Sequence, residues 1–371
     1  MARPVAFTAV SAVGLAALAF AGPAQAAQSP PAAPHWSIAY RSHSAAESYL
    51  VSVVAPTKTD AWAIGSAGKN QPVVVNWNGK AWKPVNVPGT SGFTPDTVYA
   101  SSPGNVWITG TSKSGAGVAH VWNGTTKTWR TISLPVNFYG AAVISATDVW
   151  GYGQNGGCAH TDPADTCLYR WNGTKWAAVN VPAAHGGITA AGGHAWFAGL
   201  TNVKPVKGNS AISLTGLPAI YELTGSTVKK VSAPSARVAN TVQVAAAPNG
   251  RLWLGTRLPT TTAPQTLFHW TGKAWTRIGI PATANGLPLL IETNLAYDGG
   301  NGVWWGGFSH WTGSRWVSTF PETGIGGYAF AVTWVSAIPG SASIWGAGVI
   351  TVTTSSDTTS DGLVAVYGPL P

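Results

Sequence analysis

Seven tryptophans recur along the 371-residue chain at nearly regular intervals. Successive members are separated by 45, 43, 46, 57, 51 and 41 residues, and the series runs Trp62, Trp107, Trp150, Trp196, Trp253, Trp304 and Trp345. A second marker keeps the same phase, because a proline closes six of the units, at Pro88, Pro135, Pro182, Pro234, Pro281 and Pro321. Two markers in phase indicate an internal repeat of roughly 40–50 residues, which constrains the fold more than any single motif does.

Within one repeat the sequence predicts four short strands. In the second unit they cover residues 97–101, 106–110, 118–122 and 128–134, and an Asn-Gly turn at 123–124 separates the last two. Asn-Gly accepts the positive φ angles of a tight hairpin, and the same dipeptide follows Trp77 and Trp171. Short strands in a unit of this length are typical of propeller blades, whereas helical repeats need a helical period. We predict an all-β fold, a seven-bladed β-propeller of four-stranded antiparallel blades.

The two ends of the repeat region are complementary halves of one blade. Residues 363–368 resemble a third strand, with Tyr367-Gly368 where other units have Trp-Asn-Gly. Residues 35–40 match the opening of a fourth strand, with Trp36 in the place of Trp82. We expect these ends to pair, because this closes the ring and leaves no open sheet edge between the first and last units.

The first 26 residues have the features of a secretory signal peptide. Arg3 precedes an apolar stretch at residues 5–21, and Ala24-Gln25-Ala26 fits a small-residue cleavage site. Residues 27–34 are expected to be a flexible leader, and residues 35–371 a single propeller domain. No later segment has eighteen uninterrupted apolar residues, so we expect a secreted protein without a membrane span after signal cleavage. We also expect a monomer.

Charge and composition limit the classes of partner that the protein is expected to bind. Only 9% of residues are charged, and the formal net charge is +9, or +8 once Arg3 is removed, because residues 1–26 hold no carboxylate. The basic residues are distributed one or two per repeat rather than in a basic stripe, which argues against nucleic-acid binding. Attraction to an anionic wall polymer or a membrane surface and simple solubility both remain compatible with this charge.

Tryptophan pairs mark four of the hairpins, each with a spacing of five residues: Trp77/Trp82, Trp171/Trp176, Trp270/Trp275 and Trp311/Trp316. The two indoles of a pair should share one face of the sheet. The simpler interpretation is packing between blades, where each ring buries up to about 200 Å². The alternative is an exposed platform on which a sugar ring stacks.

The units 59–65 and 147–153, each followed by a Trp-x-Gly hairpin, resemble the repeats of secreted bacterial Trp/Gly-rich propellers. Tectonin-type lectin repeats look similar, and Asp-box repeats do so more distantly. The resemblance covers residues 35–371 and implies blades rather than an activity. The Asp-box pattern itself is not met, because tryptophans such as Trp77 and Trp171 stand where its aspartate would be. The Kelch signature is absent from most units, and the WD40 signature is absent from all of them.

Three successive repeats carry long connections between their second and third strands, at residues 154–166, 200–217 and 256–266. In propellers these connections share one face with the links between blades. Their polar residues suit recognition of a sugar or an anion, and the candidate ligand-binding set is His160, Asp162, Asp165, Lys204, Lys207 and Arg257. The alternative is that these surface loops have varied in length without any function, because lengthening a loop costs little free energy.

Cys158 and Cys167 are the only cysteines, and an exported protein should join them in a disulfide that staples the first long loop. The enclosed His160, Asp162 and Asp165 match no recognised metal-ligand spacing, so neither a metal nor another cofactor is expected. His269 and His310 each precede a third-strand tryptophan, which makes them one repeated structural position.

Catalysis has one set of candidates. Acid/base hydrolysis needs two carboxylates within about 5–10 Å of each other. Glu47, Asp96 and Glu292 should lie near the starts of first strands, which border the central channel. No nucleophile elbow, zinc-protease helix or phosphate-binding glycine loop occurs. We therefore favour a secreted binding protein for a glycan or other cell-surface component, such as a cell-wall polymer, over a glycan-directed hydrolase or lyase and over a protein-interaction scaffold.

Overall fold

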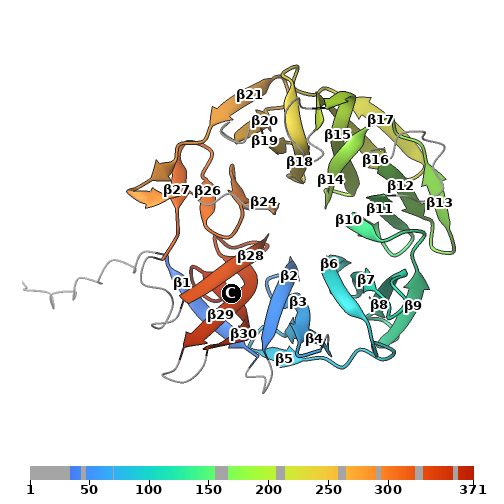
Figure 1. The fold of residues 1–371 in the computed structure, drawn as a ribbon, viewed down its shortest axis with the longest axis vertical. Helices are drawn as coiled ribbons and strands as arrows, with labels where there is room; N and C mark the ends of the chain where they lie inside the picture. Colours follow the sequence, from blue (N-terminus) through green and yellow to red (C-terminus); the bar gives the residue numbers. More distant parts are fainter. Residues whose placement is uncertain are drawn as a thin grey trace, which may run out of the picture. The chain divides into compact units, whose positions relative to one another are not determined.

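The computed structural model describes residues 34–42, 47–69, 71–154, 166–205, 214–257, 265–289, 294–321, 329–353 and 358–371. Pro34–Pro371 form one compact unit. Its described residues build a seven-bladed propeller of antiparallel four-stranded sheets, as the repeat predicts. Figure 1 views the ring down its axis, with strands β2, β6, β10, β14, β18, β24 and β28 around the centre. The described part of the chain contains no helical segment that could span a bilayer.

Each blade is a meander from the centre of the ring to its rim. The first three blades consist of β2 (Ser48–Thr57), β3 (Asp60–Ala67), β4 (Gln71–Trp77) and β5 (Trp82–Pro84); β6 (Thr94–Ser102), β7 (Asn105–Thr111), β8 (Gly117–Asn123) and β9 (Thr128–Ser133); and β10 (Phe138–Ser145), β11 (Asp148–Gln154), β12 (Thr166–Trp171) and β13 (Trp176–Val179). Blades four and five consist of β14 (Ala184–Ala191), β15 (His194–Pro205), β16 (Leu214–Thr224) and β17 (Thr227–Val231), and of β18 (Val238–Ala246), β19 (Leu252–Arg257), β20 (Thr266–Trp270) and β21 (Trp275–Gly279).

Blade six is the smallest, and a two-stranded hairpin, β22 (Thr283–Ala284) and β23 (Leu287–Pro288), precedes it. Its own strands are β24 (Leu295–Tyr297), β25 (Val303–Trp305), β26 (Ser309–Trp311) and β27 (Trp316–Ser318). The amide of Asn285 in the hairpin accepts a hydrogen bond from the backbone of Ser318 (2.8 Å) and donates one back to it (3.1 Å). The hairpin therefore covers the outer edge of β27, which would otherwise be an open strand.

The chain ends meet in blade seven. This blade contains β28 (Ala329–Ala337), β29 (Ile344–Thr353) and β30 (Thr358–Tyr367), and β1 (Trp36–Arg41) pairs with β30 as its fourth strand. Trp36 lies opposite Tyr367, as Trp82 lies opposite Trp77 in blade one. The predicted closure is therefore confirmed. In Figure 1 the blue β1 runs beside the red strands of this blade.

The tryptophan pairs hold neighbouring blades together. The second-strand Trp345 of blade seven packs against Trp77 and Trp82 of blade one, with ring centroids 5.2 and 5.1 Å away. Trp107 of blade two packs in the same way against Trp171 and Trp176 of blade three, each at 6.2 Å. Blades without such a pair use aliphatic substitutes in the same place, such as Leu223 and Val228, which join the cluster around Trp150. The second-strand tryptophan of each blade is thus buried by the hairpin of the next.

A further pair in blade two, Trp122 and Trp129, is separated by seven residues rather than five because its turn is two residues longer. Its ring centroids are 5.4 Å apart, and Trp62 of blade one packs against both. All twenty tryptophans lie in the described ranges, and none of them is an exposed side chain. The alternative that the pairs are open sugar-stacking platforms is therefore wrong.

A glycine three residues after the second-strand tryptophan shapes the inner strand. Gly65, Gly110, Gly153 and Gly348 each lie opposite a β-bulge in the first strand of their blade. A Cβ atom at Gly110 would lie 2.1 Å from the carbonyl oxygen of Thr94, and one at Gly65 would lie 1.9 Å from that of Tyr49. Only glycine leaves room for the bulged strand to bend at this end of the channel.

The predicted loop at 200–217 is wrong over most of its described length. β15 continues to Pro205 and β16 begins at Leu214, with Lys204 paired to Thr215. The extension is stable as a sheet because Gly216 pairs with Val238 of the neighbouring β18. Lys204 therefore lies on a strand rather than in a loop. Blade six, by contrast, has only three residues between β25 and β26.

Candidate functional site

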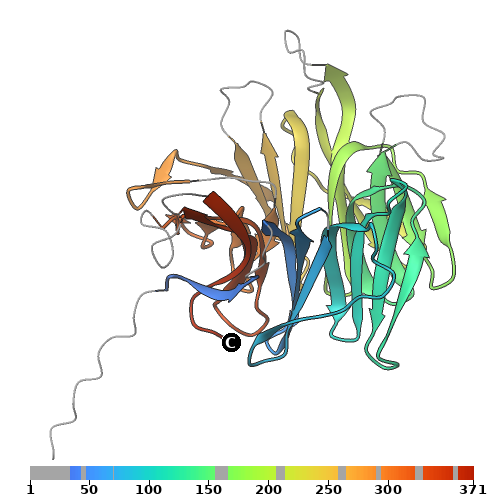
Figure 2. The same cartoon turned by 60° about the horizontal axis from the view of Figure 1, so that its bottom comes forward.

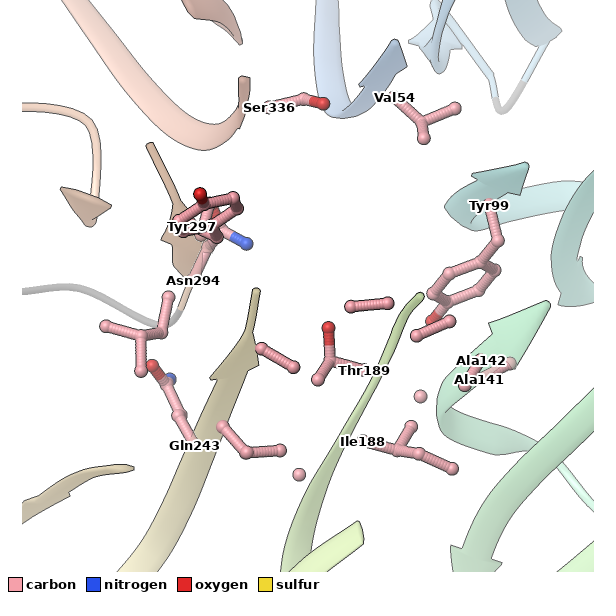
Figure 3. Close-up of a pocket in the computed structure, with 18 of the residues that line it drawn as sticks. Val54, Tyr99, Ala141, Ala142, Ile188, Thr189, Gln243, Asn294, Tyr297 and Ser336 are labelled. Atoms are coloured by element: carbon pink, nitrogen blue, oxygen red, sulfur yellow. The ribbon is translucent and has the colours of Figure 1, made fainter. Parts of the chain in front are cut away.

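The seven first strands surround a cavity of about 600 Å³ in the centre of the ring. This volume lies within the range of small-molecule binding sites, which is about 300–1,000 Å³. The wall consists largely of small and apolar residues, among them Val54, Ala141, Ala142 and Ile188. Figure 3 shows these residues around the open centre, carried by strands that lie far apart in the sequence.

Polar groups are interspersed in this wall, and none of the described lining residues carries a carboxylate, ammonium, guanidinium or imidazole group. They are hydroxyl, phenol and carboxamide side chains: Tyr99, Tyr139, Tyr152, Thr189, Gln243, Asn294, Tyr297 and Ser336. The described cavity wall is thus uncharged, although the chain as a whole is strongly basic.

Two of these polar groups, Asn294 and Ser336, stabilise the ring, and so does Ser52 of β2, which does not line the cavity. The inner edge of each blade is its first strand, which has no further strand to pair with, so its exposed N–H groups need other acceptors. Three side chains accept such bonds from the next blade, from Val98 to Ser52 (3.2 Å), from Ala55 to Ser336 (3.1 Å) and from Val335 to Asn294 (2.8 Å). The Tyr297 hydroxyl donates to the Gly300 carbonyl at 3.0 Å. These groups are engaged within the protein.

Thr189 differs from them. Its side chain points from β14 toward the middle of the cavity, between Tyr99 on one side and Asn294 and Tyr297 on the other (Figure 3). Its hydroxyl makes no recorded hydrogen bond with the described residues. A free hydroxyl in an uncharged wall can both donate to and accept from a bound ligand.

Tyrosines line the part of the cavity formed by blades two and three. Burial raises the pKa of Tyr99 to about 12, although contacts with the Thr97 side chain and the Ala141 backbone oppose the rise. Burial also raises the pKa of Tyr152. Both phenols therefore stay protonated near neutral pH. Tyr139 packs edge-on to Tyr152 with centroids 6.2 Å apart, yet its side chain is 62% exposed.

The two faces of the ring differ in their connections. We call the face with the turns between first and second strands, and between third and fourth strands, the turn face. The opposite face, where first strands begin and second strands end, is the loop face. Tyr139 is the second residue of β10 and so lies at the loop-face mouth of the cavity. Tyr49, the second residue of β2, is 44% exposed on the same face but does not line the cavity.

The predicted ligand-binding set is only partly described. Lys204 is exposed on the β15 extension at the loop face. Arg257 ends β19 at the same face, although its side chain is outside the described part. His160, Asp162, Asp165 and Lys207 lie outside the described residues. The six residues therefore remain predictions as a group, and the cavity tyrosines and Thr189 are functional candidates that sequence reasoning missed.

The predicted catalytic carboxylates are likewise incompletely described. Glu47 is exposed just before β2, and Asp96 is the third residue of β6. Desolvation of the Asp96 carboxyl group raises its pKa. Neither residue lines the cavity, and Glu292 lies outside the described residues. Cys167 is buried, and its predicted disulfide partner Cys158 is also outside them. No group of three potential metal ligands comes together within the described ranges.

The repeated histidine position is structural, as predicted. His310 stacks on Trp304, and His269 stacks on Trp253 at 4.9 Å with an interplanar angle of 11°. Burial lowers the pKa of His269, and the charge of Arg251 lowers it further. The two histidines occupy different blades, opposite the second-strand tryptophan of each. They therefore act separately.

No family model matches the sequence, and no curated protein matches it. Among solved structures, the β-propeller domain of the Trilobed protease from Pyrococcus furiosus is similar, with a TM-score of 0.53 and 9% identity over 85% of this chain and 97% of that one. A YCF48 structure with a bound D1 peptide has a TM-score of 0.48 and 13% identity over 90% of this chain and 96% of that one. The fucose-recognising fungal lectin of Aleuria aurantia has a TM-score of 0.39 and 13% identity over 64% and 80% of the two chains.

The similarity to the protease propeller domain supports the propeller fold alone, because the identity is low. The narrower resemblance to tectonin-type and Asp-box repeats receives no support from these comparisons and stays a prediction. The function has to be argued from the cavity itself.

Proposed function

We propose that the protein is a secreted, non-catalytic binding protein that takes the end of an uncharged glycan into the loop-face mouth of its central channel. The observation that carries the proposal is the chemistry of the cavity. A space of about 600 Å³ is lined, in its described part, by hydroxyl, phenol and carboxamide groups on an apolar wall, without a charged side chain. A neutral sugar presents the matching surface, with many hydroxyl groups and apolar C–H faces.

Each available group has a defined role in this proposal. The Thr189 hydroxyl exchanges hydrogen bonds with a sugar hydroxyl in the middle of the cavity. The exposed ring of Tyr139 stacks on the apolar face of the sugar at the mouth. An ionised ligand would lose its hydration in this space without gaining a counter-charge from the described wall, so the site selects against it. The predicted loop residues, Lys204 among them, remain candidates for further contacts to the same ligand.

A glycan panel with neutral and acidic members, followed by calorimetric titration of the best binder, tests the proposal. Thr189→Val removes one hydroxyl without changing the shape of the side chain, and we expect a loss of affinity of about 3–10-fold. Tyr139→Ala removes the stacking ring and should weaken binding by a similar factor or more. Tyr49→Ala is the matched control, because it removes an exposed tyrosine from the same face outside the cavity.

Saturable binding of a neutral glycan that both cavity variants weaken and Tyr49→Ala leaves unchanged would support the proposal. Preference for acidic glycans, or equal binding by all variants, would contradict it. The absence of any glycan ligand would favour the scaffold hypothesis instead.

One observation keeps a hydrolase as the second candidate. Asp96 is exposed near the loop-face start of β6, and desolvation of its carboxyl group raises its pKa, the direction that a general acid needs. The same glycan panel tests this reaction by mass spectrometry. Products that form with the unchanged protein and not with Asp96→Asn would replace the binding proposal with the catalytic one.

A further inference from the structure

The turn face carries a ring of basic side chains. Five of the seven blades have a lysine or arginine in the hairpin turn between their third and fourth strands, and blade one has another in its first turn. These exposed residues are Lys80, Lys127, Lys175, Lys273, Arg315 and Lys58. Residues that are scattered along the sequence occupy equivalent places in successive blades, so the fold gathers them on one face.

Contacts between the turns confirm that they share this face. In blade two, the amide of Gly124 in the second hairpin donates to the carbonyl of Gly104 in the first turn at 2.9 Å. In blade one, the Trp77 indole donates to the carbonyl of Lys58 at 3.2 Å. The C-terminus, which follows the equivalent end of β30, marks this face in Figure 2. The five hairpin residues therefore project from turns near the rim, and Lys58 projects from a turn nearer the axis on the same side of the ring.

The acidic groups on the turn face have hydrogen-bond or ion-pair partners outside the ring of basic side chains, although the charge of Lys127 also acts on Asp60. Asp60 accepts hydrogen bonds from Trp62 and Asn76, at 2.8 and 3.3 Å. Asp148 forms an ion pair with Arg170 at 3.0 Å. In a separate blade, His310 bonds to Asp298 at 2.9 Å.

Glu222 completes this set by pairing with His194 at 2.9 Å. None of the six basic residues of the ring forms a recorded ion pair with any residue in the described ranges. Lys127 lies close enough to Asp60 for its charge to act on that carboxylate, and the other five cations leave the turn face with positive charge that no described carboxylate pairs.

The geometry of the ring determines what it can bind. Each cation belongs to a different turn, and those of the hairpins belong to different blades, so one small anion cannot contact several of them. The blades repeat around one axis, so equivalent turns lie at a common level, and a flat surface with many negative charges can meet them together. The neighbours of these lysines in the turns are small or polar residues, such as Asn78, Gly79 and Ala81, so insertion into a bilayer is not needed.

We propose that the turn face adsorbs to the surface of an anionic lipid bilayer, with the loop-face mouth of the channel directed away from it. The attraction is electrostatic and falls with rising salt, because ions screen charges near a surface. Each lysine or arginine near an anionic bilayer strengthens binding by about fivefold. This binding is independent of the glycan proposal, because it uses the opposite face.

Co-sedimentation of the protein with phosphatidylcholine vesicles, with and without phosphatidylglycerol, tests this directly. The variant Lys80→Gln/Lys175→Gln/Lys273→Gln removes three charges from the ring, and we expect it to bind the anionic vesicles roughly 100-fold more weakly. The control Lys69→Gln/Lys113→Gln/Lys230→Gln removes the same charge from exposed positions outside the turn face, two in connections of the loop face and one on β17, and should lose much less. Circular dichroism establishes that both variants are folded.

Binding that requires phosphatidylglycerol, weakens with salt and depends on the turn-face lysines would support the proposal. Equal losses in the two triple variants would overturn it, because the effect would then follow net charge alone. Failure to bind anionic vesicles would overturn it as well. Soluble polyphosphate that binds the protein more tightly than the vesicles do would replace the lipid surface with a free polyanion. Glycan titration of the same variants should be unchanged, which keeps the two proposals separate.

Discussion

Trp304 and His310 stack face to face, with ring centroids 4.3 Å apart and an interplanar angle of 2°. Asp298 accepts a hydrogen bond from the His310 Nε2 atom at 2.9 Å and so fixes the orientation of the imidazole. The same arrangement recurs in blade one, where Asn76 lies opposite Trp62 and bonds to Asp60. An acid in the first turn, a second-strand tryptophan and a polar third-strand residue thus form a repeated structural clamp.

The hydrogen-bonded carboxylate of Asp298 should make the stability of the fold vary with pH in the acid range. Burial raises the pKa of Asp298, but hydrogen bonds from His310, Gly300 and Gly302 outweigh burial and hold it below the usual 3.8. A lowered pKa adds stability that is present above pH 3.8 and is lost as the pH falls through the folded-state value. Asp298→Asn should therefore lower the free energy of unfolding at neutral pH by about 1–3 kcal/mol. Calorimetric Tm values should show this gap closing below pH 3.8; a gap that is constant with pH would contradict the assignment.

The equivalent acid in blade one should behave in the opposite way. Burial raises the pKa of Asp60 above 3.8 despite its bonds from Asn76 and Trp62. The ionised carboxylate therefore destabilises the fold as the pH rises through its folded-state pKa. The Tm of Asp60→Asn, relative to the unchanged protein, should increase between acid and neutral pH. A relative Tm that decreases over this range would show that hydrogen bonding, and not burial, dominates at Asp60.

The tryptophan that joins the last blade to the first should be among the most important for stability. Trp345 is completely buried between Trp77 and Trp82. Trp345→Ala should lower the free energy of unfolding by about 3–5 kcal/mol. Trp345→Phe keeps an aromatic ring in the seam between blades seven and one and should lower it by less. Urea unfolding measures both values. A loss below about 1 kcal/mol for the alanine variant would mean that the seam contributes little.

The glycine opposite the bulge should not tolerate even the smallest substitution, which is alanine. Gly110→Ala places a Cβ atom 2.1 Å from the Thr94 carbonyl oxygen, so the inner strand has to move. We expect a loss of about 2–4 kcal/mol in urea unfolding, or insoluble protein. Gly279→Ala is the matched control, because the new Cβ meets nothing within 4 Å. Equal stability of the two variants would contradict the role of Gly110.

The repeat markers were sufficient to predict the blades, because every blade needs the same buried tryptophan and the same turn residues. They also predicted the pairing of Trp36 with Tyr367 across the ring closure. The Trp122/Trp129 pair could not be found by its spacing, because Lys127 with a φ of 56° lengthens the turn. The strand extension at 200–205 was missed because its partner β16 is itself flanked at Thr215 and Gly216 by β18, which belongs to the next blade.

The candidate site was harder to predict. Thr189 lies at one position of β14, and the equivalent residues of blades two and three are Tyr99 and Ala142. No spacing or motif marks these residues, since the cavity depends on side chains from all seven first strands meeting at the axis. The turn-face cations were equally hidden, because a charge placed once per repeat looks dispersed in the sequence and becomes a ring only in the folded protein.

The central claim is that a ligand occupies the channel, and a blocked channel tests it most directly. Ala190 lines the cavity and is exposed, so Ala190→Trp places a large ring in the space without disturbing a packed core. Ala178→Trp adds the same ring to exposed β13 at the rim. In calorimetric titration with the best neutral glycan, we predict that Ala190→Trp abolishes binding and that Ala178→Trp binds as the unchanged protein does. Full affinity in Ala190→Trp would contradict a channel site.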